Sequence, residues 1–178
     1  MKKTIIAIVG SSGSGKTTLS LYMNNVYGIP YICSYTTRPM RDGETDGIEH
    51  IFVTDKDVPD KSEMLAYTVF GGYQYWALKT QVKEIVTYVI DEKGLFYLLD
   101  NFKDQYNIIT VYVQRDNIDG VDETRKNRDT DRISINEADY DLILVNNYPD
   151  KDLMCKHCSE HILNYIETFK SKDNASNE

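Results

Sequence analysis

The chain has 178 residues, of which 41% are hydrophobic and 27% charged, a balance typical of a folded globular domain. Its formal net charge of −8 at pH 7 argues against a broad nucleic-acid-binding or anionic-membrane surface, so any basic site must be local. No apolar run reaches the roughly 18 residues of a membrane span, and three cysteines provide no paired disulfide framework. We therefore expect one domain over residues 1–178, located in the cytoplasm as a monomer or homodimer, with no nucleic-acid or membrane partner.

The sequence of the first half of the chain predicts one helix and several short strands. Residues 4–9 (TIIAIV) are β-branched and fully apolar, which indicates a buried parallel strand. A helix is predicted from Gly15 to about Gly28, with Leu19 and Met23 on one face. Further strand-like runs, separated by loops rich in Asp, Gly and Pro, lie at 29–33, 48–53 and 64–70.

The second half continues the alternation of strands and helices. A strand at 86–90 ends at Asp91, and a helix at 92–106 carries leucines at helical spacing. Such alternation predicts an α/β fold with a mainly parallel sheet, into which the short strands before residue 82 are inserted as a small lobe. The remaining predicted elements are a strand at 108–113, a charged helical region at 116–139, a strand at 142–145, a helix at 151–169 and a polar tail at 171–178.

A glycine-rich loop directly follows the first strand. Residues 10–17 (GSSGSGKT) fit the pattern G-x-x-x-x-G-K-[ST] between a strand and a helix, the context that confirms this motif over an accidental glycine-rich turn. The glycines allow backbone N–H groups to surround phosphate oxygens. We expect Lys16 to reach the β and γ phosphates of ATP and the Thr17 hydroxyl to bind Mg²⁺. The predicted ATP-binding residues are Gly10, Ser11, Ser12, Gly13, Ser14, Gly15, Lys16, Thr17 and Thr18.

A second candidate anion site lies at residues 34–44 (SYTTRPMRDGE). Arg38 and Arg41 stand three residues apart, and two guanidinium groups at this spacing can converge on one phosphate. Pro39 restricts the backbone between them. The alternative is a solvated surface loop with scattered charges.

The P-loop followed by S-x-T-T-R-x-x-R-x-G-E resembles the guanylate kinase family. This resemblance extends over about residues 4–147 and implies a three-layer P-loop NTPase fold, with core segments 1–32 and 82–170. It also implies a β-rich lobe for a nucleoside monophosphate at 33–81 and an arginine-bearing lid at about 116–138. Further matching positions are Asp46-Gly47, Ile51–Val53, Phe70-Gly71, Tyr75, Asp91 and the run LILVNN.

The implied reaction transfers the γ-phosphoryl group of ATP, with Mg²⁺, to the phosphate of a ribo- or deoxynucleoside monophosphate, with GMP as the first candidate. His50 stands where the family usually has a tyrosine that touches the acceptor phosphate. The resemblance implies that the acceptor-binding residues are Ser34, Arg38, Arg41, Glu44, His50, Tyr75 and Asp91.

Four arginines lie between residues 115 and 132. An arginine-bearing lid can neutralise charge on the transferred phosphoryl group and exclude water. By resemblance, Arg128 and Arg132 are the catalytic arginines, acting with Lys16, and Arg115 and Arg125 are the weaker candidates. The alternative is a solvated helix with salt bridges to neighbouring aspartates.

The base-reading part departs from the family pattern. The family places a glutamate before its Phe-Gly segment to accept from guanine, but residues 65–68 (LAYT) contain no acid, and Ala77 stands where a hydroxyl is expected. Unpaired donors on a buried base cost roughly 1–3 kcal/mol each. Guanine selection is therefore weakened while phosphate capture is kept. Trp76 either stacks on a base or belongs to the core.

Two further alternatives concern the C-terminal segment and the function. Cys155, His157, Cys158 and His161 include zinc-ligand residue types, but their spacing favours a helix packed on the core through Met154, Cys158, Ile162, Tyr165 and Phe169.

The competing functions are a P-loop kinase for another phosphorylated small molecule and a non-catalytic phosphopeptide-binding module. The intact P-loop with Lys16 argues against the binding module.

Overall fold

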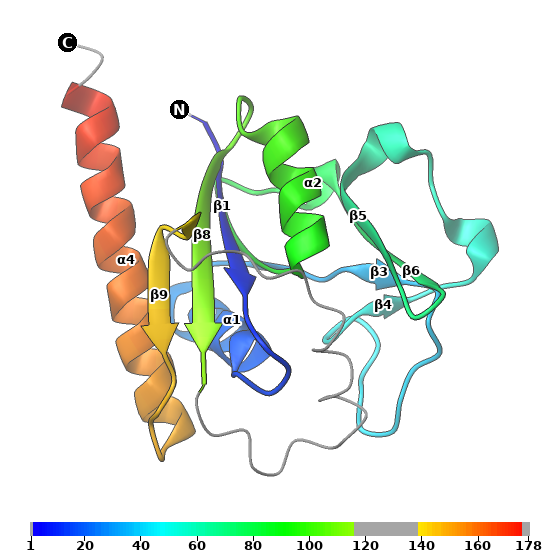
Figure 1. Ribbon diagram of the computed structural model, residues 1–178, viewed down its shortest axis with the longest axis horizontal. Helices are drawn as coiled ribbons and strands as arrows, with labels where there is room; N and C mark the ends of the chain where they lie inside the picture. Colours follow the sequence, from blue (N-terminus) through cyan, green and yellow to red (C-terminus); the bar gives the residue numbers. More distant parts are fainter. Residues whose placement is uncertain (1, 116–138, 176–178) are drawn as a thin grey trace.

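The computed structural model describes residues 2–115 and 139–175, and its centre is a five-stranded sheet in the order β2-β7-β1-β8-β9 (Figure 1). Every pair of neighbouring strands in this sheet is parallel, as the alternation of strands and helices predicted. The strands are β1 (Thr4–Val9), β2 (Tyr31–Ile32), β7 (Ile85–Val89), β8 (Asn107–Gln114) and β9 (Leu142–Val145).

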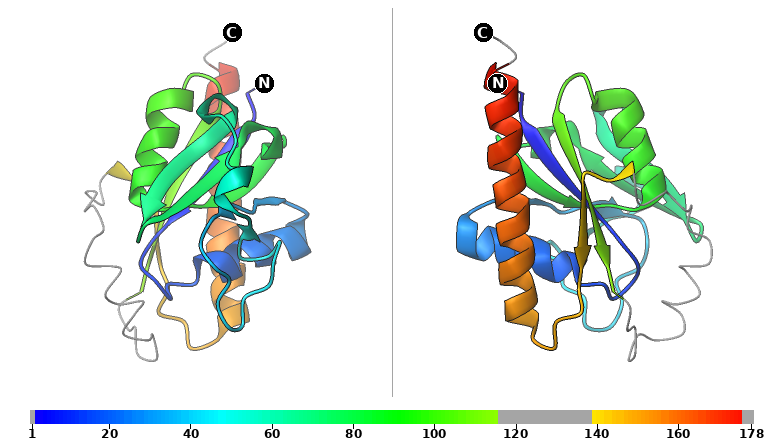
Figure 2. Two further views of the ribbon diagram at one scale, coloured as in Figure 1. Left: turned by 90° about the vertical axis from the view of Figure 1, so that its right-hand side faces the viewer. Right: turned by 60° about the vertical axis from the view of Figure 1, so that its left-hand side comes forward.

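Helices cover both faces of the parallel sheet (Figure 2). Helices α1 (Lys16–Tyr27) and α4 (Lys151–Ala175) pack together on one face, and α2 (Glu92–Phe102) lies on the other. Strand β1 is buried along its whole length because its side chains alternate between two apolar clusters, one on each face. The predicted three-layer α/β fold is confirmed.

The chain between β2 and β7 forms a second sheet in the order β4-β3-β6-β5. Strand β5 pairs antiparallel with β6 and packs against α2, which attaches this sheet to the core. Its elements are β3 (Tyr35–Thr36), β4 (Ile51–Phe52), β5 (Met64–Phe70), β6 (Tyr73–Leu78) and three single turns of 3₁₀-helix, η1 (Asp55–Asp57), η2 (Lys61–Glu63) and η3 (Lys79–Gln81).

Several predicted boundaries differ from the structure. Two strands were not predicted: β6, which pairs with β5 across a tight turn at Gly71-Gly72, and the two-residue β3, whose partner in β6 lies about forty residues away. The run at 48–53 forms a strand only at Ile51–Phe52, while α2 ends at Phe102 and α4 continues to Ala175. The predicted lid at 116–138, with Arg125, Arg128 and Arg132, lies outside the described residues. No helix in the described ranges has the length and apolar character needed to cross a membrane.

Candidate active site

The glycine-rich loop joins the end of β1 to the start of α1. Gly10, Gly13 and Gly15 have φ angles of 152°, 78° and 100°, which favour glycine. A Cβ on Gly10 would collide with the Val113 carbonyl oxygen, and one on Gly15 would lie 2.8 Å from Met154 Cε. These glycines therefore serve both the backbone turn and the close packing of the loop on β8 and α4.

Side chains from three parts of the chain hold the carbonyl groups of this loop. Lys16 Nζ donates to the carbonyl oxygens of Gly10 at 2.6 Å and Ser11 at 2.7 Å. Asn146 Nδ2 donates to Ser14 O at 2.7 Å from the end of β9, and Arg115 Nη1 donates to Gly13 O at 3.0 Å. The lysine ammonium is thus already at the mouth of the loop, within reach of a phosphate bound there.

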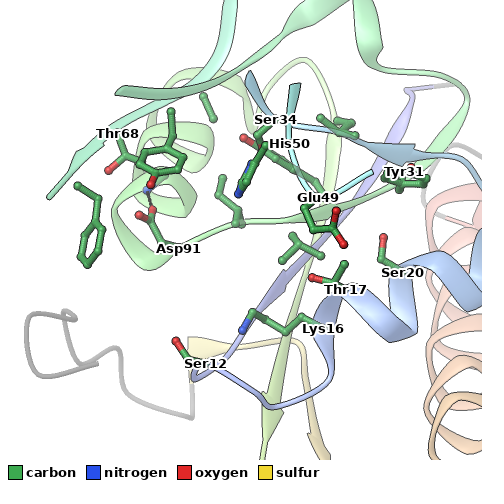
Figure 3. A pocket seen from close by; sticks show the side chains of 18 of the residues that line it. Ser12, Lys16, Thr17, Ser20, Tyr31, Ser34, Glu49, His50, Thr68 and Asp91 are labelled. Carbon is green, nitrogen blue, oxygen red and sulfur yellow. Dashed lines mark hydrogen bonds between the residues drawn. The ribbon is translucent and has the colours of Figure 1, made fainter. Parts of the chain in front are cut away.

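A cavity of about 390 Å³ lies between the P-loop and the second sheet (Figure 3). Residues as far apart in the sequence as Gly10 and Gly94 line it together, because the carboxyl ends of the parallel strands meet here. Among the predicted ATP-binding residues, Ser11, Ser14, Gly15 and Thr18 do not line it. The predicted residues that line it are Gly10, Ser12, Gly13, Lys16, Thr17, Ser34, Arg38, Arg41, Glu44, His50, Tyr75 and Asp91.

The two arginines of residues 34–44 are tied together by a glutamate. Arg38, only 6% exposed, forms an ion pair of 2.9 Å with Glu44 Oε1, and Glu44 Oε2 accepts from the backbone N–H of Arg41 at 2.9 Å. Burial acts to raise the pKa of the Glu44 carboxyl, but hydrogen bonds and the charges of Arg38 and Arg41 hold the pKa below its usual range. Glu44 therefore stays ionised and positions Arg38, so this stretch is an ordered clamp.

His50 lies beside this clamp. Its ring packs edge-to-face against Tyr75, with ring centroids 5.6 Å apart, and it bonds to the backbone of Ser34. Burial and the charge of Arg38 lower the pKa of the His50 imidazole below its usual value, so the ring is neutral at pH 7. Nδ1 is buried and has no hydrogen-bond partner among the described residues.

The opposite wall of the cavity carries Asp91, which is the N-cap of α2. Asp91 Oδ1 accepts from Gly94 N at 2.6 Å, and burial raises the pKa of the Asp91 carboxyl. Gly94 is required here because an added Cβ would lie 2.8 Å from Ile90 Cγ1 and 3.0 Å from Asp91 Oδ1. Nearby, the Ser34 hydroxyl bonds to the Tyr88 hydroxyl, so both point to the same end of the cavity.

The cavity also contains residues that were not predicted to belong to it. One of them is Thr68, which shares a face of β5 with Ala66 and Phe70 at alternate positions. This period-two pattern, in which Thr68 is the hydroxyl on the same face as Ala66 and Phe70, is a signal in the sequence that identifies Thr68. Ala66 pairs with Ala77 across β5 and β6, so two alanines face each other where an acid and a hydroxyl were expected. The other lining residues with polar side chains that were not predicted are Ser20, Tyr31, Glu49, Tyr67 and Tyr88.

Two alternatives from the sequence are decided by the structure. Trp76 is 1% exposed and stacks on Tyr35 with ring centroids 5.6 Å apart, outside the cavity lining, so the base-stacking interpretation is wrong. Along α4, Cys155 and Cys158 are buried in the apolar cluster with Met154 and Ile162, which confirms the packing interpretation. His157 stacks on Tyr148, and no group of three possible metal ligands occurs in the described part of the chain.

Comparison with known proteins agrees with this geometry. The sequence model of the family described as guanylate kinase matches residues 1–164. The chain belongs to the guanylate kinase family. Its parallel sheet, P-loop and second sheet are thus the fold of that family.

The relatives of this guanylate kinase family member are distant in sequence. A guanylate kinase of Helicobacter pylori strain 26695 is 25% identical over 179 residues, covering 95% of this chain and 82% of the relative. A guanylate kinase of Aliivibrio fischeri is 34% identical over 106 residues, covering 56% of this chain and 48% of the relative. The crystal structure of guanylate kinase from Anaplasma phagocytophilum superposes with a TM-score of 0.68 at 20% identity, covering 92% and 86% of the two chains. This structural likeness supports the fold.

Proposed function

We propose that this protein is a nucleoside monophosphate kinase, which transfers the γ-phosphoryl group of ATP to the phosphate of a ribo- or deoxynucleoside monophosphate. GMP is the first candidate acceptor. The observation that carries the proposal is a single cavity whose walls hold two separate phosphate-binding groups, the P-loop and the pair Arg38 and Arg41. A nucleotide hydrolase needs only the first group, whereas transfer to a phosphorylated acceptor needs both.

The donor side fits ATP with Mg²⁺. The P-loop glycines leave its backbone open to the cavity, the Lys16 ammonium stands at its mouth, and Thr17 is exposed toward the same space. When bound, Mg²⁺ would take the Thr17 hydroxyl as a ligand and neutralise charge on the β and γ phosphates. Lys16 then exchanges its bonds to the loop carbonyls for bonds to those phosphates.

The acceptor side orients the attacking group. Arg38 and Arg41 hold the acceptor phosphate, and the ion pair with Glu44 keeps Arg38 in place before the substrate arrives. An oxygen of this phosphate attacks the γ-phosphorus in line, and the bond from that phosphorus to the β,γ-bridging oxygen breaks. The products are ADP and a nucleoside diphosphate. Arg128 and Arg132, outside the described residues, are proposed by family resemblance to add positive charge at the transferred group.

A coupled assay of ADP release with each common ribo- and deoxynucleoside monophosphate tests the proposal. We expect turnover with at least one of them, GMP being tested first. Lys16→Ala should lower kcat by about a hundredfold or more, because it removes a charge that stabilises the transition state. Arg41→Ala should raise the acceptor KM by about tenfold or more, because a charge-assisted hydrogen bond is lost. Failure to release ADP with every monophosphate would reject the proposal.

Ligand-dependent melting separates the two sites. Binding to the native state raises the melting temperature, so ATP with Mg²⁺ should stabilise Arg41→Ala but not Lys16→Ala. The acceptor should stabilise Lys16→Ala but not Arg41→Ala. Loss of both responses in either variant would show that the variant is misfolded, and turnover data from it would then be set aside.

A second candidate is a P-loop kinase for a phosphorylated acceptor other than GMP. The observation that favours it is the pairing of Ala66 with Ala77, which removes polar groups from the wall where a base would be read. The same assay distinguishes the two, since this candidate predicts turnover with a non-guanine acceptor. A phosphopeptide-binding module would show no dependence on Lys16, whose side chain and loop are intact in this chain.

A further inference from the structure

One hydroxyl group in the cavity has no role in the proposed phosphate chemistry. Thr68 projects from β5 into the cavity (Figure 3), and its Oγ1 is buried with no hydrogen bond of good geometry to any described residue. A buried hydroxyl without a partner costs about 1–3 kcal/mol. It is therefore a group that a ligand is expected to satisfy.

The Asp91 carboxylate lies next to Thr68 on the same wall. Its Oδ1 is occupied by Gly94 N at 2.6 Å, which leaves Oδ2 as the acceptor available to a ligand. Burial has the largest effect on the Asp91 carboxyl and raises its pKa. The contact with the Thr68 hydroxyl acts in the opposite direction and lowers this pKa. A hydroxyl beside an ionised carboxylate directs its proton toward it, because the carboxylate has no proton to give.

The lone pairs of Thr68 Oγ1 then face the cavity beside Asp91 Oδ2, so this wall presents two adjacent acceptors. The Tyr67 hydroxyl on the same strand supplies no competing donor, because it donates to Gln74 Oε1 at 3.1 Å. The hydroxyls of Ser34 and Tyr88 bond to each other. The complementary ligand edge carries two adjacent N–H donors.

We propose that Thr68 reads the base of the acceptor by accepting a hydrogen bond from an amino group, while Asp91, which the family resemblance already places in the acceptor site, accepts from the adjacent ring N–H. This inference rests on the proposed kinase function and adds Thr68 as a specificity-determining residue of its acceptor site. Guanine carries such an edge. Adenine and cytosine have a ring nitrogen lone pair beside their amino group, and uracil and thymine have a carbonyl on each side of their ring N–H. Each of these edges would place a lone pair of the base against an acceptor of Thr68 or Asp91.

Comparing GMP with IMP tests the proposal, because IMP lacks only the amino group. At about pH 8, well above the ordinary carboxyl pKa, we expect wild-type kcat/KM to be about tenfold higher for GMP than for IMP, one hydrogen bond being lost with IMP. Thr68→Val, which has the same shape without the hydroxyl, should bring the GMP-to-IMP ratio close to one. Thr68→Ser keeps the hydroxyl and should keep the ratio.

The ratio distinguishes base reading from a merely structural role. Equal losses of kcat/KM with GMP and IMP in Thr68→Val would overturn the proposal, as would a wild-type ratio near one. Absence of turnover with every monophosphate would instead reject the kinase function itself.

Discussion

Charged residues in this site are held by ion pairs and hydrogen bonds that form before any substrate binds. Glu44 is the clearest case, since one carboxylate pairs with the Arg38 guanidinium and accepts from the Arg41 backbone. A buried arginine without such a partner would be strongly destabilising. The clamp is therefore stable while empty, and under the proposed function an acceptor phosphate would meet positive charge that is already in position.

His50 gives a pH-dependent prediction at the residue scale. Burial and Arg38 lower the pKa of His50 from its ordinary 6.5, so the unfolded chain binds a proton at this residue more readily than the folded chain. Stability must then fall as pH drops from about 6.5 through the lowered pKa of the folded state. We expect the free energy of unfolding to decrease more steeply on acidification in wild type than in His50→Gln.

Urea denaturation of both proteins at about pH 7.5, 6.5 and 5.5 measures this difference. The comparison with His50→Gln isolates one histidine, because the remaining titratable groups are shared. A constant difference in stability between the two proteins across this range would contradict the lowered pKa.

At the scale of elements, the P-loop is held by parts of the chain that come much later. Asn146 follows β9 and bonds to Ser14 O, while Met154 of α4 packs against Gly15. The motif that binds phosphate is thus shaped by the C-terminal third of the fold. Its glycines leave room both for a phosphate and for the close approach of these later elements.

Asn146→Ala should weaken ATP binding. It leaves the buried Ser14 carbonyl without its 2.7 Å bond and loosens the loop, a loss of about 1–2 kcal/mol that corresponds to about a tenfold rise in the KM for ATP. The acceptor KM should change much less. Steady-state kinetics with each substrate varied in turn measures both constants.

The matched control for this substitution is Asn101→Ala. Asn101 Nδ2 bonds to the Tyr97 carbonyl on an exposed part of α2, away from the loop. It should leave both KM values close to those of wild type. Equal effects of Asn146→Ala on the two substrates would point to general loosening of the fold.

At the scale of the whole molecule, α4 completes the core on one face of the parallel sheet. Cys155, Cys158 and Ile162 are buried with Leu19 and Met23 of α1, so the helix that begins with the P-loop lysine packs on the last helix of the chain. The nucleotide site therefore depends on a core that is closed only when the C-terminal helix is in place.

Ile162→Ala should destabilise the entire domain. Ile162 is 0% exposed, and loss of its buried methyl groups costs about 3 kcal/mol, which for a chain of this length lowers the melting temperature by about 9 °C. The control Ile143→Ala, on the edge strand and 40% exposed, should change stability by about 0.5 kcal/mol or less. Thermal unfolding followed by circular dichroism provides both values, and equal shifts would disprove the packing assigned to α4.

The sequence by itself determined the parts of this protein whose chemistry is local. The P-loop is recognisable from residues 10–17 because its glycines, lysine and threonine act on one phosphate chain within a single turn. The arginine clamp is equally local, and its glutamate lies only six residues from Arg38. A continuous apolar run also predicted the fully buried strand β1, and the alternation of strand-like and helical segments predicted the α/β fold with its parallel sheet.

Only the tertiary structure decided which residues meet. Trp76 packs on Tyr35 through a strand pairing that spans about forty residues, and local spacing does not reveal such a register. Thr68 becomes a candidate base reader because β5 packs on α2, which brings its hydroxyl beside Asp91. Burial is the physical reason for both outcomes, since it determines which polar atoms lose water and must find a partner in the fold or in a ligand.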